Sequence, residues 1–339
     1  MAKSFVESSF VQPDERLEVT LRPSSLADFT GQDKIKHKLE VVMTAAKQRQ
    51  EALCHCLFSG PPGLGKTTLA SIVAKTMGAQ LICTSGPVIE KAGDLAGILT
   101  HLNTGDVLFI DEIHRLNRAI EEYLYPAMED FSLDLTVDSG AAARSVKVKI
   151  KPFTLIGATT RSGLLSSPMR SRFGLALRLD YYEMDPLVHI LKRSAQILGC
   201  SLEDKAAVAI AQRSRGTPRI ANNLLKWVRD VAQVQNLQKI DEKCATSALN
   251  QLEIDEKGLD EMDKKILSLM IDSYQGGPVG INTLAAALSE EAHTLEEVHE
   301  PFLITQGLLK RTQRGREVTP LAYAHLGKKA PLIQQGELL

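Results

Sequence analysis

A glycine-rich run at residues 60–67 is the part of the sequence whose residue types and spacing point most directly to chemistry. It reads Gly-Pro-Pro-Gly-Leu-Gly-Lys-Thr and fits the pattern G-x-x-x-x-G-K-[ST], a loop that wraps nucleotide phosphates. Glycine lets the backbone approach the phosphates closely, and the N–H groups at the start of the next helix attract negative charge. We expect Lys66 to reach the terminal phosphates and the hydroxyl of Thr67 to bind Mg²⁺. The loop therefore predicts binding of a nucleoside triphosphate.

Two adjacent acids, Asp111 and Glu112, follow the apolar run Val107–Ile110. The carboxyl end of a parallel strand is where ligands bind in such sheets. We expect Asp111 to hold Mg²⁺, directly or through water, and Glu112 to polarise the water that attacks the γ-phosphate. Standing alone, the pair could be an ordinary acidic turn after a core strand. The phosphate loop earlier in the chain favours the catalytic interpretation.

Three further polar residues could complete such a site, although their spacing alone leaves this open. Thr159 lies near the end of the apolar run Phe153–Arg161 and could bond the γ-phosphate or the attacking water. Arg172 and Arg219 each carry a guanidinium suited to bidentate contact with phosphate oxygens. Arg219 follows Pro218, which is typical of the first turn of a helix. A surface salt bridge would explain either arginine equally well.

These residues need a sheet that brings strand ends together, and the sequence predicts one. Strand-like apolar runs alternate with helical patterns at Leu53–Phe58, Thr68–Met77, Gln80–Thr84, Gly93–Leu102 and Asp106–Ile110. Such alternation predicts an α/β fold, a parallel sheet with helices on both faces. Residues 133–151 interrupt it with two alternating runs around Asp138-Ser139-Gly140, which is typical of a β-hairpin.

The rest of the chain divides into two smaller parts. Four amphipathic helical patterns lie at Pro186–Leu198, Ser201–Ser214, Pro218–Asn236 and Asp241–Leu252. Three short helical patterns and two strand-like runs around Gly315 follow, as in a winged helix. We therefore predict a large α/β domain with an N-terminal arm at 1–180, a small helical lid domain at 181–254 and a winged-helix domain at 255–339.

Charge is balanced over the whole chain, so any site for nucleic acid must be local. The formal net charge is −1, with 40 basic and 41 acidic residues, which provides no strong global field. Four cations, Lys310, Arg311, Arg314 and Arg316, cluster around the expected turn at Gly315. A solvated charged hairpin is the alternative to a DNA-binding wing.

The helix expected before this wing carries acids instead of cations. It opens with Thr294-Leu295-Glu296-Glu297, which fits a capping box, and it also carries Glu300. Acids at these positions would repel phosphate. We therefore predict that the wing, chiefly Arg311 and Arg316, follows the DNA backbone without reading its sequence.

The cysteines and the apolar runs indicate the compartment. The five cysteines are odd in number and scattered, which favours reduced thiols in the cytoplasm. Cys54-His55-Cys56 might suggest a metal site, but it lies in an apolar run and is better explained as a buried strand. No run of ~18 apolar residues and no signal peptide are found, so we expect a cytoplasmic protein without a membrane segment.

Taken together, these motifs resemble those of the AAA+ ATPases and, among them, the RuvB family of branch-migration motors. The resemblance is carried by Arg22-Pro23, Gly60–Ala70 (GPPGLGKTTLA), Phe109–Leu116 (FIDEIHRL), Gly157–Arg161 (GATTR), Ser171–Gly174 (SRFG), Gly216–Arg219 (GTPR) and Arg311–Arg316 (RTQRGR). By this resemblance Asp111 and Glu112 form the Walker B motif and Thr159 is sensor 1. It likewise makes Arg172 the arginine finger of a neighbouring subunit and Arg219 sensor 2.

The resemblance implies further contacts and partners that spacing does not reveal. It adds nucleotide contacts from Leu21, Arg22, Gly63, Thr68, Glu129, Asp130, Phe131 and Tyr182. It implies a DNA-dependent ATP hydrolase that uses Mg²⁺, forms a hexameric ring on duplex DNA at Holliday junctions, and drives their branch migration. It also implies docking of the hairpin at 133–151 on RuvA through Val146 and Val148, with RuvC in the larger complex. A hairpin packed inward is the alternative for those valines.

Two other functions share part of this pattern. A clamp-loader-type ATPase has the same core and the Ser-Arg finger, but it usually ends in a helical collar, and the winged-helix pattern argues against it. A nucleotide-gated DNA-binding regulator would use ATP only to change shape. Glu112 speaks against such a pure switch, because it supplies the group that hydrolysis needs.

Overall fold

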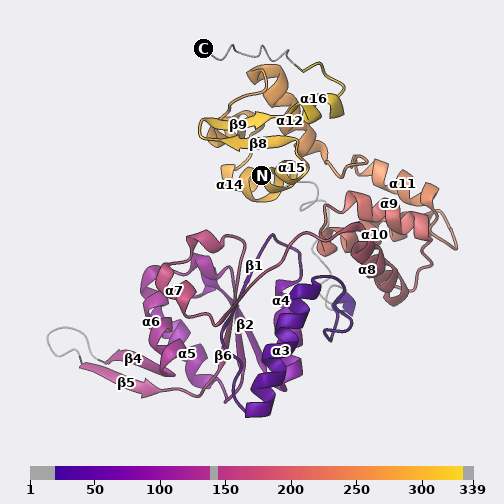
Figure 1. Cartoon of the computed structure of the whole chain (residues 1–339). Helices are drawn as coiled ribbons and strands as arrows, with labels where there is room; N and C mark the ends of the chain where they lie inside the picture. The colour runs from indigo at the N-terminus through magenta and orange to yellow at the C-terminus, as the bar shows by residue number, and fades with distance from the viewer. Residues whose placement is uncertain (1–19, 138–143, 331–339) are drawn as a thin grey trace. The chain divides into compact units, whose positions relative to one another are not determined.

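The computed structural model describes residues 20–137 and 144–330 of the chain (Figure 1). The predicted N-terminal arm and the hairpin turn at 138–140 lie outside the described residues. The described residues form two compact units: a sheet unit of residues 20–197 and 216–219, and a terminal unit of residues 198–215 and 220–330. The two boundaries between the three domains expected from the sequence stay predictions.

A five-stranded parallel sheet forms the centre of the sheet unit. Its strands are β1 (Cys56–Ser59), β2 (Leu81–Ser85), β3 (Val107–Asp111), β6 (Thr154–Thr159) and β7 (Leu175–Arg178), in the order β2-β3-β6-β1-β7. Every residue of β6 is buried, and so are the first four of β3, as expected of parallel strands covered on both faces. The order places the carboxyl ends of β3 and β1 on either side of β6.

Helices cover both faces of this sheet, as predicted. They are α3 (Asp33–Arg49), α4 (Lys66–Met77), α5 (Ala92–His101), α6 (Arg118–Glu129) and the short α7 (Ser167–Ser171). Figure 1 shows α3 and α4 on one side of the strands, and α5, α6 and α7 on the other. On the second side, Leu95 and Leu99 of α5 and Leu124 of α6 pack against Leu108 and Leu155 of the sheet. Burial of these side chains supplies the main stabilisation of this face.

A separate antiparallel hairpin follows α6. It consists of β4 (Ser132–Val137) and β5 (Arg144–Lys149), which pair as the alternating pattern predicts, with Leu133 opposite Val148. Leu133 is fully buried, whereas Val146 is 46% exposed. The hairpin therefore has one end anchored in the core of the sheet unit and apolar surface left on β5.

The terminal unit is helical, with one more hairpin. Helix α8 (Met184–Ile197) still belongs to the sheet unit, and α10 (Pro218–Val234) begins in it. The other elements are α9 (Asp204–Arg213), α11 (Glu242–Gln251), α12 (Glu261–Tyr274), α13 (Ile281–Leu288), α14 (Ala292–Thr294), α15 (Glu300–Thr305), β8 (Leu309–Thr312), β9 (Gly315–Val318) and α16 (Pro320–His325). From α12 onward they enclose one core, which includes Leu267, Met270 and Phe302. Together with the β8–β9 hairpin, this is the predicted winged helix.

The capping box expected at Thr294 is wrong. Thr294 has helical backbone angles (φ −62, ψ −46), whereas a capping residue is normally extended. The extended residue is Glu291, and the helix begins directly after it. A π-helical stretch, Leu295–His299, then joins α14 to α15. Thr294 and Glu297 match the capping pattern only by spacing, because α14 has already begun before them.

A buried charged cluster lies inside the terminal unit. Arg215 contacts Asp263 at 2.6 Å and Asp260 at 2.9 Å, and its guanidinium lies 4.7 Å from the ring centre of Phe302. His299 Nδ1 lies 2.7 Å from Asp263, and both acids and His299 are fully buried. Although burial alone would raise the pKa of Asp260, Arg215 and His299 hold it below its usual value. Arg215 supplies the positive charge among these carboxylates, so the cluster needs no metal ion.

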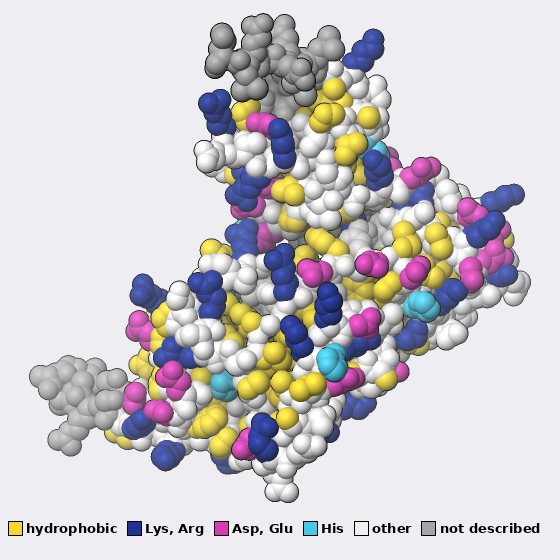
Figure 2. Space-filling model, viewed as in Figure 1, with side chains coloured by type: hydrophobic (Ala, Val, Ile, Leu, Met, Phe, Trp, Pro, Cys, Tyr) yellow, Lys and Arg dark blue, Asp and Glu magenta, His cyan; other side chains and the backbone are white. Residues whose placement is uncertain are grey.

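No helix within the described part of the chain is both long enough and apolar enough to cross a membrane. On the face shown in Figure 2, basic and acidic side chains are interspersed. This mixture matches the near-zero net charge of the sequence.

Candidate functional site

The glycine-rich loop lies between β1 and α4, and its glycines are required by its geometry. Gly60, Gly63 and Gly65 all have positive φ angles of 137, 77 and 99. A Cβ atom on Gly60 would lie 2.3 Å from the carbonyl oxygen of Leu179, and one on Gly63 would lie 2.6 Å from Thr217. No other residue type fits these positions without a shift of the backbone. The loop therefore leaves its N–H groups at the start of α4, where phosphate binds.

Lys66 is buried within this loop, at 8% exposure. Its Nζ donates hydrogen bonds to the carbonyl oxygens of Gly60 and Pro61, both at 2.8 Å. Burial lowers the pKa of Lys66 to about 8, while Asp111 and Glu112 raise it and Arg219 lowers it further. All three charged residues thus lie within electrostatic reach of Lys66.

The two acids sit at the end of β3, as the sequence predicts. Asp111 Oδ1 accepts a hydrogen bond from the backbone N–H of Glu112 at 2.9 Å. Glu112 has a left-handed backbone (φ 46, ψ 42), and its carboxylate pairs with Arg115 at 2.8 Å. Thr67 lies in the first turn of α4. The hydroxyl of Thr67 and the carboxylate of Asp111 are the oxygen ligands that Mg²⁺ prefers, so these residues fit that ion.

Thr159 ends β6 beside the loop. It pairs with Ser59 in the sheet register, and its carbonyl accepts a hydrogen bond from Gly60 N–H at 3.1 Å. Its buried hydroxyl lies 2.9 Å from His114 Nδ1. Sequence reasoning missed His114, although it follows Glu112 by two positions within the motif FIDEIHRL. Thr159 thus links β6 both to the loop and to the segment that carries the acids.

Tyr182 and the segment 216–219 border the loop. The hydroxyl of Tyr182 donates a hydrogen bond to the carbonyl oxygen of Leu64 at 3.3 Å. The backbone N–H of Tyr182 donates to the carbonyl oxygen of Gly216 at 2.8 Å. The backbone N–H of Arg219 donates to the carbonyl oxygen of Gly63 at 3.4 Å. Burial raises the pKa of Tyr182, so its hydroxyl stays protonated. These contacts place both residues directly beside the loop.

The other residues implied to contact nucleotide near the loop differ in exposure. Thr68 is buried in α4. Leu21 is also buried, and its carbonyl accepts a hydrogen bond from Arg193. Arg22 is exposed, and its charge acts to lower the pKa of Cys83 on β2, although burial of Cys83 raises that pKa overall.

Arg172 belongs to a second cluster, at the end of α6. Its guanidinium contacts Glu129 at 3.2 Å and the carbonyl oxygen of Pro168 at 2.7 Å, and it lies 4.2 Å from the ring centre of Tyr125. Its Nε is buried without a hydrogen-bond partner. The contacts of Arg172 are thus with Glu129 and its surroundings, whereas the charged neighbours of Lys66 are Asp111, Glu112 and Arg219.

Two neighbours of Glu129 complete this second cluster. Asp130 pairs with Lys147 of β5 at 3.2 Å. Phe131 has a left-handed backbone (φ 49) and packs edge-on against Phe153, with ring centres 6.1 Å apart. The three consecutive residues from Glu129 to Phe131 therefore face three different surroundings: an arginine, the hairpin and the core.

The two wing arginines are placed differently from each other. Arg311 is exposed and contacts Glu296 at 3.0 Å. Arg316 is only 7% exposed, and it contacts Glu300 at 2.8 Å and Glu296 at 3.3 Å. The two acids expected to repel phosphate therefore pair with the wing, a contact that their positions in the sequence did not reveal. Arg314 lies exposed next to the turn at Gly315.

The buried-strand interpretation of residues 54–56 holds only in part, because β1 begins at Cys56 and Cys54 is exposed. His55 is buried, its Nε2 lies 3.1 Å from the carbonyl oxygen of Met128, and its Nδ1 accepts a hydrogen bond from Leu155 N–H at 2.8 Å. Both ring nitrogens are therefore engaged with the backbone. Burial also lowers the pKa of His55, which keeps it neutral.

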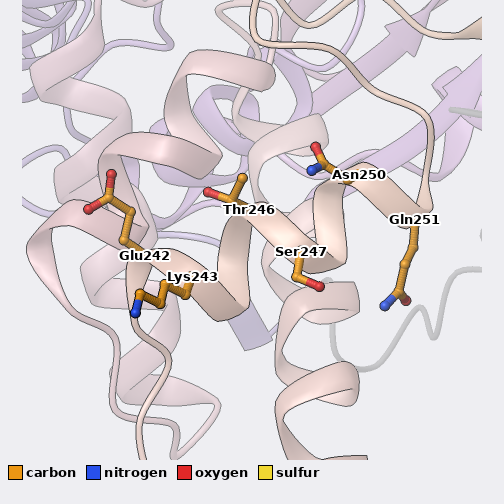
Figure 3. A pocket seen from close by; sticks show the side chains of 6 residues that line it. All are labelled: Glu242, Lys243, Thr246, Ser247, Asn250 and Gln251. Atoms are coloured by element: carbon orange, nitrogen blue, oxygen red, sulfur yellow. The ribbon is translucent and has the colours of Figure 1, made fainter.

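A shallow hollow on α11 is a feature apart from these clusters. Figure 3 shows the six side chains that line it: Glu242, Lys243, Thr246, Ser247, Asn250 and Gln251. All six come from one helix, and none of them was predicted as a site residue. We assign it no function.

Comparison with known families agrees with this geometry. Three family models match consecutive parts of the chain: the "Holliday junction DNA helicase RuvB P-loop domain" at 21–179, the "RuvB AAA lid domain" at 182–255, and the "RuvB C-terminal winged helix domain" at 256–327. These matches, with the parallel sheet, confirm the predicted fold class.

Similar proteins carry the same family name. The chain is 64% identical over 326 residues to the "Holliday junction branch migration complex subunit RuvB" of Protochlamydia amoebophila, covering 96% of this chain and 98% of that protein. It is 57% identical over 320 residues to the protein of the same name from Flavobacterium psychrophilum, covering 94% of each. The solved structure of the Thermotoga maritima RuvB Holliday junction branch migration motor matches with a TM-score of 0.85 and 53% identity, covering 92% of this chain and 100% of that one. The chain therefore belongs to the RuvB family of AAA+ P-loop proteins.

Proposed function

We propose that this protein is a Mg²⁺-dependent ATP hydrolase that drives branch migration of Holliday junctions as part of a complex with RuvA. The names of its relatives support this activity. The observation that carries it is Lys66, a buried cation held on loop carbonyls within electrostatic reach of Asp111 and Glu112. A buried ammonium of this kind is costly unless an anion binds it, and a triphosphate supplies that anion.

The loop residues bind and orient the nucleotide in this proposal. Lys66 exchanges the carbonyl oxygens of Gly60 and Pro61 for phosphate oxygens, and the loop N–H groups donate to the remaining ones. Thr67 and Asp111 hold Mg²⁺, which neutralises charge on the phosphates when bound. Arg219 adds a second cation near Gly63, where its backbone already meets the loop.

Glu112 orients the attacking water in this proposal. Its carboxylate is paired with Arg115 at 2.8 Å, and both side chains are roughly half exposed. An exposed pair of this kind contributes about 0–1 kcal/mol, so Glu112 can leave it at little cost. Thr159 holds β6 against the loop through its bonds to Gly60 and His114, and so positions the loop. It contacts the γ-phosphate directly when its hydroxyl leaves His114.

Arg172 completes the site of a neighbouring subunit in a hexameric ring. Its present partner, Glu129, is 57% exposed and can be replaced by phosphate oxygens. We expect Arg172→Ala protein to bind ATP without hydrolysing it. Mixing it with Glu112→Ala protein, whose arginine is intact, should restore some phosphate release, because some sites then hold both groups. No recovery over a range of mixing ratios would contradict assembly across subunits.

The winged helix binds duplex DNA through its wing. Lys310, Arg311 and Arg314 lie exposed on or beside the β8–β9 turn, whereas Arg316 contacts DNA only if it leaves Glu300. Contacts to phosphate from such side chains give affinity without sequence preference. The winged-helix domain also disfavours the clamp-loader alternative, which would end in a helical collar.

The β4–β5 hairpin docks on RuvA through its apolar face. Val146 is largely exposed, Val148 is partly buried, and Leu133 opposite it is buried and anchors the pair. An exposed valine on a projecting hairpin is available for a hydrophobic contact with a partner. RuvC belongs to the same larger complex in this proposal, and the protein acts in the cytoplasm.

A branch-migration assay on a synthetic four-way junction tests the proposal directly. We expect ATP-dependent conversion of the junction to two duplexes, stimulated by RuvA and lost in Lys66→Ala and Glu112→Ala proteins. Steady-state phosphate release measured in the same reactions separates a motor from a nucleotide-gated DNA-binding regulator. Junction binding without phosphate release would favour the regulator and refute the motor.

A further inference from the structure

Cys54 and Cys56, on either side of His55 at the start of β1, form a pair of thiols. Cys54 is exposed, and Cys56 is buried as the first residue of the strand. The Cys56 thiol donates a hydrogen bond to the carbonyl oxygen of Cys54 at 3.3 Å. His55 contacts Met128 and Leu155 and takes no part in the pair.

The two thiols differ chemically. The neighbouring Cys56 thiol lowers the pKa of Cys54 to about 7, against the effect of burial and with help from the charge of Arg49. The neighbouring Cys54 thiol, together with burial, raises the pKa of Cys56 well above its ordinary value. Burial raises the pKa of Cys83, Cys200 and Cys244. Cys54 alone among the five is thus an exposed thiol with a large thiolate fraction near pH 7.

We propose that Cys54 is a site of reversible oxidation by hydrogen peroxide, and that Cys56 then closes a disulfide with it. The Cys54 thiolate attacks one peroxide oxygen, the O–O bond breaks, and hydroxide leaves with the second oxygen, which gives a sulfenic acid at Cys54. The sulfur of Cys56 then attacks the Cys54 sulfur and releases the added oxygen as water, taking up the proton of the Cys56 thiol. Peroxide is reduced to two molecules of water, and two thiols are oxidised to one disulfide.

The spacing of the pair makes this disulfide easy to reduce. Residues two apart have Cα atoms at most about 6.6–7.2 Å apart, and disulfides accept about 4.4–6.8 Å. A bond between residues this close in sequence therefore closes a small ring and constrains the backbone at residues 54–56. Strained disulfides have more oxidising potentials and are the ones that reductants open readily.

Oxidation would act on two segments of the proposed ATP site. A Cβ atom on Gly174 would lie 3.1 Å from Cys54 Cβ and 3.5 Å from its sulfur, so this glycine packs directly on the Cys54 side chain. Gly174 is two residues from Arg172, and β1 leads from Cys56 into Gly60. We expect ATP turnover to fall in the oxidised protein, an effect that rests on the proposed function.

Peptide mapping after peroxide treatment tests the oxidation without reference to ATP. The full-length protein is treated with hydrogen peroxide at pH 7, alkylated, digested and analysed by mass spectrometry. We expect loss of two hydrogens from the peptide holding Cys54 and Cys56, reversed by dithiothreitol. In Cys56→Ser protein, we expect a Cys54 sulfenic acid that dimedone traps. In Cys54→Ser protein, Cys56 should stay unmodified.

Cys83 provides the matched control, because it is exposed but has a raised pKa. Even if Cys83 kept the ordinary thiol pKa of 9.0, the thiolate fraction of Cys54 at pH 7 would exceed that of Cys83 by roughly 50-fold, and the lower nucleophilicity of the more acidic thiol would reduce this advantage roughly tenfold. Cys54 should therefore oxidise at least about fivefold faster than Cys83. Equal rates, or a Cys54–Cys56 peptide of unchanged mass, would overturn the proposal.

Phosphate release, measured on the same samples, then tests the effect on turnover. We expect peroxide to lower the turnover of wild-type and Cys83→Ser protein, dithiothreitol to restore it, and Cys54→Ser protein to be insensitive. A mapped disulfide with unchanged turnover would refute the influence through Gly174 while leaving the oxidation site established. An untreated protein without phosphate release would count against the proposed function, and the mapping would still decide the oxidation.

Discussion

Raising the pH from 7 to 9 should weaken nucleotide binding about tenfold, because Lys66 loses its proton. Burial lowers the pKa of Lys66 to about 8 in the free protein. From that pKa, about 90% of Lys66 is charged at pH 7 and about 10% at pH 9. Bound phosphate raises the pKa of this lysine, so the nucleotide binds the protein with charged Lys66 more tightly than the protein with neutral Lys66. Its apparent affinity should follow the charged fraction.

The same titration should act on stability in the opposite direction. The pKa of Lys66 is about 8 in the folded protein, against 10.5 for the unperturbed side chain. Between these values the unfolded chain binds more protons than the folded one, so the free energy of unfolding rises with pH. A fall of the pKa from 10.5 to about 8 corresponds to about 3 kcal/mol, gained between about pH 8 and 10.5.

Isothermal titration calorimetry with a non-hydrolysable ATP analogue between pH 7 and 9 measures the affinity, and urea unfolding between pH 7 and 10.5 measures the stability. The control is Lys66→Met, which keeps the side-chain volume and cannot titrate. It should bind weakly at every pH, and its stability should lack the gain that wild type shows. An affinity for wild type that is flat between pH 7 and 9, or that falls equally in Lys66→Met, would refute the reasoning.

Three further predictions rest on other parts of the structure. Arg215→Met should lower the free energy of unfolding by about 3–5 kcal/mol in urea titrations, because it removes the guanidinium that contacts both buried acids, Asp260 and Asp263. The more exposed pair made by Arg229 offers a control, for which Arg229→Met should cost no more than about 1 kcal/mol. Equal losses would contradict the burial argument. Arg311→Ala should reduce the slope of log Kd against log salt for duplex DNA by about one, equally for unrelated sequences; an unchanged slope would remove this residue from the interface. Val146→Asp combined with Val148→Asp should abolish stimulation by RuvA and leave DNA-independent phosphate release intact, and normal stimulation would remove the hairpin from this role.

Local patterns were sufficient to predict the elements around the phosphate loop. The predicted helix Gly93–Leu102 is α5 (Ala92–His101), and the predicted strand Asp106–Ile110 is β3 (Val107–Asp111). Apolar runs define such elements because parallel strands are buried on both faces. The strand β7 was missed, because Leu175–Arg178 is short and only partly buried. The strand order was not predictable either, because crossover connections leave no mark in the local sequence.

The candidate site was predictable where one motif holds all the residues. Gly63, Lys66 and Thr67 share a loop, so their proximity follows from spacing. The contact between Thr159 and His114 joins positions 45 residues apart, and only the register of the sheet brings them together. The burial of Arg316 was not predictable from the sequence either, because a charged side chain is normally exposed. It is buried because it pairs with Glu300 of α15, 16 residues earlier in the chain.

The pairing of the wing arginines with Glu296 and Glu300 has a consequence for movement along DNA. A side chain that reads a base through paired hydrogen bonds favours the correct base by about 1–3 kcal/mol. A motor with such contacts would dwell about 5- to 150-fold longer at some base pairs than at others. Here the buried Arg316 contacts both Glu296 and Glu300 of the helical segment that precedes the wing. This segment is therefore poorly suited to hydrogen-bonding base edges. The free energy of binding then changes little from one base pair to the next. The chemical cycle, rather than the base sequence, sets the pace of each step.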